Sequence, residues 1–386
     1  MVSRANINPE VLKWARIDAG YDESNLPKNL LKNYQKWENG SVKPTWNQLR
    51  ELANQFKRPS AFFFRKEIPV VKKTSLIEYR QKNNEFIHDK SPNLIYNIRL
   101  CENLRKNYIE LMERMYSHQK SFKKYRVDFK DVTEVSNHFR NILDLDLNEQ
   151  KKWFVTDSGS HDFKHYNFLN NWKIALNNIG VLVFETERVS IDEMRALAIY
   201  HDNYPIIILN GADSVNSRIF SLFHELTHLI LGESAICDLE DENKKEIFCN
   251  AVSGEFLVPF EDLNKTEIKD ISSNTDDNKI ESILLKISNI YGVSREVILR
   301  RTLDLNKISK EYYNSKKNEW NENYKKTDKN SGGNYLNNKL KYYGKEYSSL
   351  ILSAYENKII SSVEFSDFMN LSIKHVPKLE HLIFGD

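Results

Sequence analysis

Apolar residues along the first part of the chain recur every three or four positions, with breaks at Gly20 and Gly40. This spacing predicts short helices. Pro9 suits the first turn of one helix, and Pro44 and Thr45 begin another. Residues 1–68 therefore predict a helical unit of the size of a helix-turn-helix domain.

Further along, long helical patterns enclose a group of short apolar runs. Helices are predicted over residues 91–117, 167–178, 218–232, 244–257 and 281–305. Strand-like runs cover residues 181–184, 196–200 and 205–209. A small sheet among many helices predicts an α+β fold.

The pattern divides the chain into five parts. A region rich in Asn, Lys and Ser, which ends at Gly332 and Gly333, predicts a polar linker. The predicted parts are a helix-turn-helix domain (1–68), a helical linker region (69–160), a core with the sheet (161–310), the polar linker (311–334) and a helical C-terminal domain (335–386).

Composition narrows the class of protein. A chain of 386 residues exceeds what one hydrophobic core usually supports. It has no apolar run long enough for a membrane span and no secretory signal at its start, so we expect a cytoplasmic protein that does not bind a membrane. Cys101, Cys237 and Cys249 are scattered, and we expect reduced thiols.

Charge is nearly balanced overall but not locally. The chain has 56 basic and 54 acidic residues, which argues against indiscriminate binding of polyanions. Residues 1–70 contain twelve Lys and Arg against seven Asp and Glu. This segment is therefore the most plausible part to face nucleic acid.

The strongest chemical signal is the sequence His224-Glu225-Leu226-Thr227-His228 within a predicted helix. Two histidines four residues apart project from one face, so their ring nitrogens can bind one zinc ion. Glu225 would stand beside the metal as a general base. The alternative is a buried amphipathic helix with two incidental histidines.

A zinc peptidase needs a third protein ligand, and the next predicted helix offers candidates. Glu246 and Asn250 share one helical face, with Glu246 as the predicted ligand and Asn250 as a residue that orients it or the motif helix. Glu246 could instead be a surface glutamate, and Asn250 an exposed amide. Glu255 would lie around the helix from Glu246, while His201 could close the fourth coordination position.

These residues resemble the ImmA/IrrE family of metallopeptidases. The resemblance rests on the HExxH helix that begins at Arg218 and on a second helix of the form E-x-x-x-N, from Glu246 to a Leu-x-Pro motif at Pro259. It implies a gluzincin-like site, with zinc bound by His224, His228 and Glu246 and with Glu225 catalytic.

The N-terminal segment resembles the XRE-type helix-turn-helix domain that is often fused before this peptidase. Trp37, Glu38 and Gly40, followed by Pro44 and Thr45, carry that resemblance. The segment before Trp37 is short and lacks the Gln and Ala-Ala pattern of the preceding helix. DNA binding and protein docking therefore both stay open for residues 1–68.

If the N-terminal domain binds DNA, its contacts would be with the phosphates. Lys28, Lys32 and Lys36 are spaced by four on one predicted helical face, where they would position the protein without reading sequence.

Two functions are consistent with the sequence. The first is a zinc endopeptidase that cleaves a regulatory protein, a repressor or antitoxin encoded nearby, in a stress, phage or mobile-element response. The second is a DNA-binding regulator or antitoxin-like protein whose metal site senses without cleaving.

For the peptidase, we expect an extended substrate to bind against an edge of the small sheet. The candidate edges are Ile206, Ile207 and Ile208 within residues 205–209, or residues 196–200. Both runs could instead be interior.

Overall fold

The computed structural model describes residues 3–23, 25–69, 91–116, 131–154, 161–236, 242–272, 275–325 and 334–385. The chain divides into two compact units, Met1–Glu102 and Asn103–Asp386. Helices dominate both, and the described residues contain one three-stranded sheet, which agrees with the predicted α+β class. No described helix is long and apolar enough to span a membrane.

The first unit begins with the short helices that the sequence predicted. They are α1 (Pro9–Asp18), α2 (Lys28–Glu38), α3 (Trp46–Gln55) and the 3₁₀ turn η1 (Ser60–Phe64). Asn8 caps α1, and Thr45 with Gln48 forms a capping box at α3. The helices enclose a core that includes Tyr34 and Phe56, whose rings pack edge to face at 6.1 Å. These contacts establish a packed helical domain.

The boundary between the units falls inside a long helix, α5 (Pro92–Met115). The helices before the sheet are α6 (Val132–Leu143), α7 (Leu147–Lys152) and α8 (His161–Asn178). The strands are β1 (Leu182–Thr186), β2 (Ala196–Ile199) and β3 (Ile206–Asn210). These elements confirm the predicted strand runs to within a few residues.

Helices continue from the sheet towards the C-terminus. Those of the core are α9 (Val215–Ile236), α10 (Glu242–Leu257), α11 (Phe260–Leu263), η2 (Glu267–Asp270), α12 (Asp277–Tyr291) and α13 (Arg295–Asp304). The remaining ones are α14 (Lys310–Lys325), α15 (Tyr335–Tyr343), α16 (Lys345–Glu356), α17 (Ser362–Met369), η3 (Ile373–His375) and α18 (Val376–Phe384).

The strand order is β1-β3-β2, which corrects one prediction. Ile206, Ile207 and Ile208 lie in the central strand, which pairs with β1 in parallel and with β2 antiparallel. They therefore do not form a substrate-binding edge. Every residue of β3 is buried, because a continuous apolar run is stable only where both faces and both sides are covered. The half-buried β2 is an edge strand.

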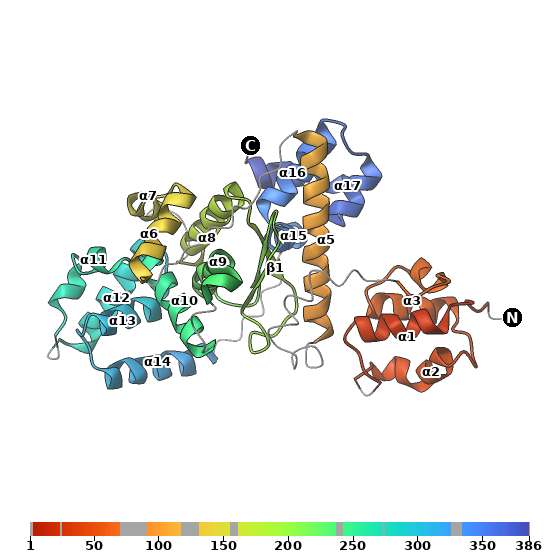
Figure 1. The fold of residues 1–386 in the computed structure, drawn as a ribbon, viewed down its shortest axis with the longest axis horizontal. Helices are drawn as coiled ribbons and strands as arrows, with labels where there is room; N and C mark the ends of the chain where they lie inside the picture. Colours follow the sequence, from red (N-terminus) through yellow and green to blue (C-terminus); the bar gives the residue numbers. More distant parts are fainter. Residues whose placement is uncertain are drawn as a thin grey trace. The chain divides into compact units, whose positions relative to one another are not determined.

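The sheet is covered on both faces within the second unit. Figure 1 shows α8 and α9 on one side, with α15 and α16 on the other. Val183 and Ile207, paired across β1 and β3, pack into the core with Phe223 of α9. On the opposite face the ring of Phe184 packs against Tyr347 of α16 at 6.3 Å. This packing holds α9 firmly beside the sheet.

The predicted polar linker over residues 311–334 is wrong for its first half, which forms α14. Lys316 Nζ donates to Asp277 at 2.6 Å, and Trp320 Nε1 donates to Glu281 at 3.1 Å. A polar composition thus folds because α12 supplies matching carboxylates. Residues 326–333 lie outside the described part of the chain.

Candidate metal centre

The two motif histidines project from α9 into a shared position. The helix buries its other face, including Leu222, Phe223 and Leu226, in the core. The side chains of His224 and His228 keep 15% and 27% of their surface exposed. Their Nε2 atoms approach to 3.1 Å, so one ion could contact both.

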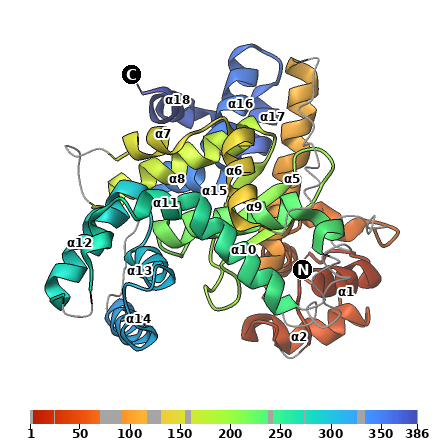
Figure 2. The same ribbon diagram turned by 60° about the vertical axis from the view of Figure 1, so that its left-hand side comes forward.

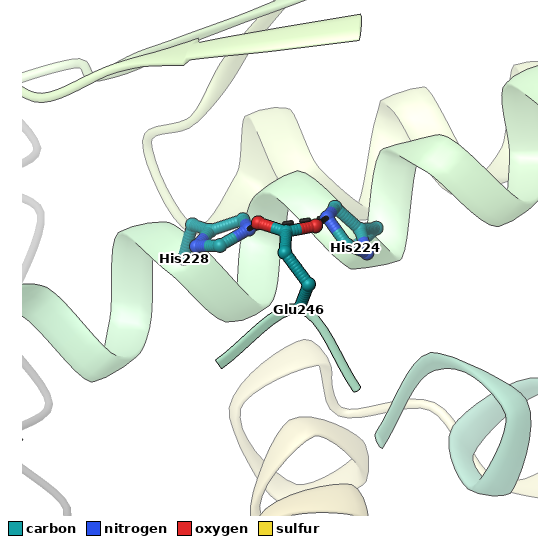
Figure 3. Close-up of side chains that lie close together, drawn as sticks. All are labelled: His224, His228 and Glu246. Carbon is teal, nitrogen blue, oxygen red and sulfur yellow. Dashed lines mark hydrogen bonds and ion pairs between the residues drawn. The ribbon is translucent and has the colours of Figure 1, made fainter. Parts of the chain in front are cut away.

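Helix α10 brings Glu246 to the same point. Its Oε2 lies 3.1 Å from His224 Nε2, and its Oε1 lies 3.3 Å from His228 Nε2. Figure 3 shows the carboxylate between the two imidazoles. One donor atom from each residue lies within 4.8 Å of the others. The structure therefore brings together the three residues that the sequence predicted as ligands.

The second nitrogen of each imidazole meets a neighbour on α10. His224 Nδ1 lies 3.1 Å from Asn250 Oδ1, and His228 Nδ1 lies 3.7 Å from Cys249 Sγ. An amide oxygen only accepts, so a proton on His224 Nδ1 can be donated to Asn250, which orients the ring with Nε2 directed at Glu246. Asn250, predicted to orient Glu246 or the motif helix, thus contacts a motif histidine, whereas Cys249 was not predicted.

The donor set suits zinc. Two neutral imidazole nitrogens and one carboxylate leave a fourth coordination position open, the composition of catalytic zinc sites. The two Nε2 atoms lie 3.1 Å apart with the Glu246 carboxylate beside them, so one cation can accept a lone pair from each imidazole. The residues present therefore fit the implied ion.

Electrostatics at the centre also favour a positive charge. Burial alone would lower the pKa of His224, but hydrogen bonding to Glu246 and the charge of Glu225 raise it overall. Hydrogen bonds from His224 and His228 hold the pKa of Glu246 well below its usual range. Both shifts arise from the close approach of the imidazoles to carboxylates.

Glu225 lies between α9 and the edge strand β2. Burial raises the pKa of its carboxyl group, while the nearby His228 and His224 and a hydrogen bond from the Ala198 backbone oppose that rise. The predicted base thus sits beside the three-residue cluster, in contact with the sheet.

The β2 edge of the sheet faces this site. Asn210 N donates to Arg195 O, which makes Arg195 and Asn210 a hydrogen-bonded pair. Because such pairs alternate along an antiparallel ladder, Ala196 and Ala198 direct their backbone groups away from β3. The hydrogen bond from Ala198 to Glu225 agrees with that direction.

Other candidate residues lie elsewhere. Among the described residues, the metal-binding group does not include His201. Glu255 forms an ion pair with Arg301 of α13, as expected for a residue that points away from Glu246. Cys237 and the acidic residues from Asp238 to Asp241 lie outside the described residues.

The three lysines predicted to contact nucleic acid belong to the first unit. Lys28, Lys32 and Lys36 all lie on α2, and all are exposed. Their spacing of four places them on one face of the helix.

A comparison with protein families agrees with this geometry. Residues 177–303 match the Peptidase_M78 family model, described as the IrrE N-terminal-like domain. The match spans the sheet, α9 and α10, and it supports a metallopeptidase domain of the ImmA/IrrE type. Comparisons with curated proteins and with solved structures gave no match. The family match leaves the first 176 residues uncovered.

Proposed function

We propose that the chain is a zinc-dependent endopeptidase of the cytoplasm, which cleaves a regulatory protein encoded near it. The observation that carries this proposal is the convergence of His224, His228 and Glu246 within 4.8 Å, with Glu225 beside them. The match to the IrrE N-terminal-like domain supports peptidase chemistry. A repressor or antitoxin is the substrate class that the family resemblance favours.

The proposed ligands are His224 Nε2, His228 Nε2 and a Glu246 carboxylate oxygen. Zinc bound there would polarise the scissile carbonyl group and lower the pKa of water to about 7. Asn250 and Cys249 hold the imidazoles from behind, so both rings keep their Nε2 atoms directed at one point.

Glu225 is the proposed base of the reaction. Its carboxylate accepts a proton from the attacking water and then delivers that proton to the nitrogen of the leaving amine. Its place beside the three proposed ligands, in contact with the Ala198 backbone, holds the carboxylate where it can accept and return a proton.

The substrate backbone is proposed to pair with β2. Ala196 directs its backbone N–H and C=O away from β3, next to the Ala198 N–H that donates to Glu225. An extended segment that adds to this edge would carry its peptide bond past the base. Slower hydrogen exchange at the Ala196 amide on substrate binding would support this placement, with the Ile207 amide of the central strand as an internal reference.

Replacement of the base tests the proposal directly. Glu225→Gln keeps the size of the side chain but removes its proton acceptor, so zinc binding should persist while cleavage falls by at least about 10²-fold. The assay incubates the zinc-loaded protein with the products of neighbouring genes and identifies fragments by mass spectrometry. Full cleavage by Glu225→Gln would refute the assignment of the base.

A DNA-binding regulator with a sensing metal site is the second candidate. The exposed row of Lys28, Lys32 and Lys36 on α2 favours it. A sensing site has no use for a general base, so the regulator predicts that Glu225→Gln keeps full biological activity.

A further inference from the structure

A pocket of about 510 Å³ lies in the second unit, between four helices of the peptidase core. Helices α9 and α10 form one side, and α13 with α14 forms the other. Figures 1 and 2 both show α9 on one side of α10, with α13 and α14 on the other. The volume falls in the range of about 300–1,000 Å³ that is usual for ligand sites.

The pocket lies next to the metal centre, although none of the three proposed ligands lines it. Asn250, which contacts His224 Nδ1 at 3.1 Å, also lines the pocket. Ser221 lines it one helical turn before His224, and Ile247 directly follows Glu246. A chain segment held at the metal centre could therefore place a neighbouring side chain in this pocket without leaving the face that α9 and α10 share.

Apolar groups are prominent in the lining. Phe220, Val297 and Tyr313 come from three different helices and line the pocket together. Ile247 also lines it, although 67% of its surface is exposed. An isoleucine that exposed beside a catalytic centre gains most from an apolar group that covers it.

The charged residues of the lining are already neutralised. Lys317 pairs with Glu296 at 2.8 Å, Arg300 pairs with Asp304 at 3.2 Å, and Arg195 pairs with Asp213 at 3.1 Å. Arg301 pairs with Glu255. Because each cation has its own carboxylate, the pocket offers little preference for an acidic side chain over an apolar one.

We propose that this pocket receives an aliphatic or aromatic side chain of the substrate, from a residue that flanks the scissile bond, and thereby determines cleavage specificity. This inference rests on the proposed peptidase function. Arg301 Nε donates to Val258 O at 3.2 Å and ties α13, which forms one side of the pocket, to the end of α10.

Hydroxamates test the pocket without requiring a known substrate. The zinc-loaded full chain is titrated by calorimetry with acetohydroxamate, which has no side chain for the pocket, and with hydroxamates that carry an isobutyl or a carboxymethyl side chain. We expect the isobutyl compound to bind about tenfold tighter than acetohydroxamate, because burial of a leucine-sized group is favourable. The carboxymethyl compound should show no such gain.

Variants assign the gain to the pocket. Ala251→Phe fills the space between α10 and its neighbours, so it should remove the advantage of the isobutyl compound. Ile247→Ala alters a largely exposed side chain, so it leaves the core intact. It should reduce the affinity advantage of the isobutyl compound over acetohydroxamate by a few-fold. Ala212→Phe adds the same ring at an exposed position outside the lining and is the matched control.

The outcomes separate the two proposals. Equal binding of isobutyl and acetyl compounds, or a preference for carboxymethyl, overturns the apolar pocket while leaving the metal centre in place. If the isobutyl compound still binds more tightly than acetohydroxamate in both Ala251→Phe and Ile247→Ala, its side chain does not lie in this pocket, and the proposed location is overturned. Failure of acetohydroxamate itself to bind counts against the proposed zinc peptidase, and the pocket proposal falls with it.

Discussion

Each motif histidine meets a different neighbour on α10, and this difference decides how firmly each ring is held. Asn250 Oδ1 contacts His224 Nδ1 at 3.1 Å, whereas a thiol, a much weaker hydrogen-bonding group, lies 3.7 Å from His228 Nδ1. The orientation of His224 therefore depends more on its partner than that of His228.

Removal of the Asn250 amide should weaken metal binding. We expect Asn250→Ala to lower zinc affinity by about 10–100-fold, the usual effect of losing a partner that orients a ligand. Cys249→Ala should cost less. Competition with a chromophoric chelator measures both, and Asn337→Ala, an exposed asparagine on α15, serves as the control. An affinity unchanged by Asn250→Ala would show that the amide does not orient His224.

A second residue-scale prediction concerns Glu185, which is buried with Lys173 and Arg218. Its carboxylate lies 2.6 Å from Lys173 Nζ and 2.6 Å from Arg218 Nη1. Glu185→Gln would leave two buried cations without their anion, so we expect a loss of about 3–5 kcal/mol in the free energy of unfolding. Glu149→Gln, at an exposed pair with Lys152, should cost at most about 1 kcal/mol. Urea denaturation monitored by circular dichroism compares the two.

The same carboxylate makes stability depend on pH. Burial would raise the pKa of Glu185, but Lys173 and Arg218 lower it overall. A pKa lower in the folded state means that this stabilisation is present above the unfolded pKa of about 4.3 and is lost as pH falls through the folded value. We expect Glu185→Gln to lose part of the acid dependence of stability seen in the wild type between neutral pH and pH 3. An identical pH profile would contradict the assignment.

Residues near one another in sequence were the most predictable. The spacing of His224 and His228 fixes their relation on any helix, so the sequence alone predicted it. The place of Cys249 depends on how α10 packs on α9 through distant contacts such as Phe223 with Phe256, whose ring centroids are 4.4 Å apart. Local periodicity does not contain that information.

At the scale of elements, the sheet also shows that local sequence predicts an element better than its neighbours. The three strand runs were predicted from their apolar residues, but strand order was not, and β3 proved central rather than exposed at an edge. The continuous apolar character of residues 206–209 could have indicated a central strand, because edge strands usually expose one face. Helix α14 was not predicted, because the residues that stabilise it, Asp277 and Glu281, lie more than thirty residues earlier in the sequence.

Two glycines that end helices provide a matched prediction. Gly292 ends α12 at φ +69°, and a Cβ there would lie 2.3 Å from the ring of Phe168. Gly385 ends α18 at φ +65° with nothing within 4 Å of such an atom. We expect Gly385→Ala to cost about 1–2 kcal/mol for the left-handed backbone alone. Gly292→Ala should cost clearly more, since the core must also move. Thermal unfolding distinguishes them, and equal melting temperatures would contradict the clash.

At the scale of the whole molecule, the family match and the first unit cover different parts of the protein. The match covers residues 177–303, while the first unit ends at Glu102 inside the continuous helix α5. The sequence placed the domain boundary at residue 68, after the aromatic run. Local pattern does not reveal that the start of α5 packs with the first unit. Arg99 of α5, for example, forms an ion pair with Asp18 of α1.

The first unit gives the last prediction, because its charge can be changed without touching the metal centre. Lys32→Glu combined with Lys36→Glu reverses two exposed charges on α2, and we expect zinc content to stay at that of the wild type. If these lysines contact DNA phosphates, affinity for duplex DNA should fall, and the slope of log affinity against log salt should decrease by about two, since each lost contact removes about 0.9. Fluorescence anisotropy across a salt series measures both quantities. Lys13→Glu combined with Lys43→Glu, also exposed in this unit, is the control pair.

The same double variant can also assign α2 to protein docking. It would then bind DNA like the wild type but no longer support cleavage of the folded partner, because only a protein contact would have lost its complementary charge.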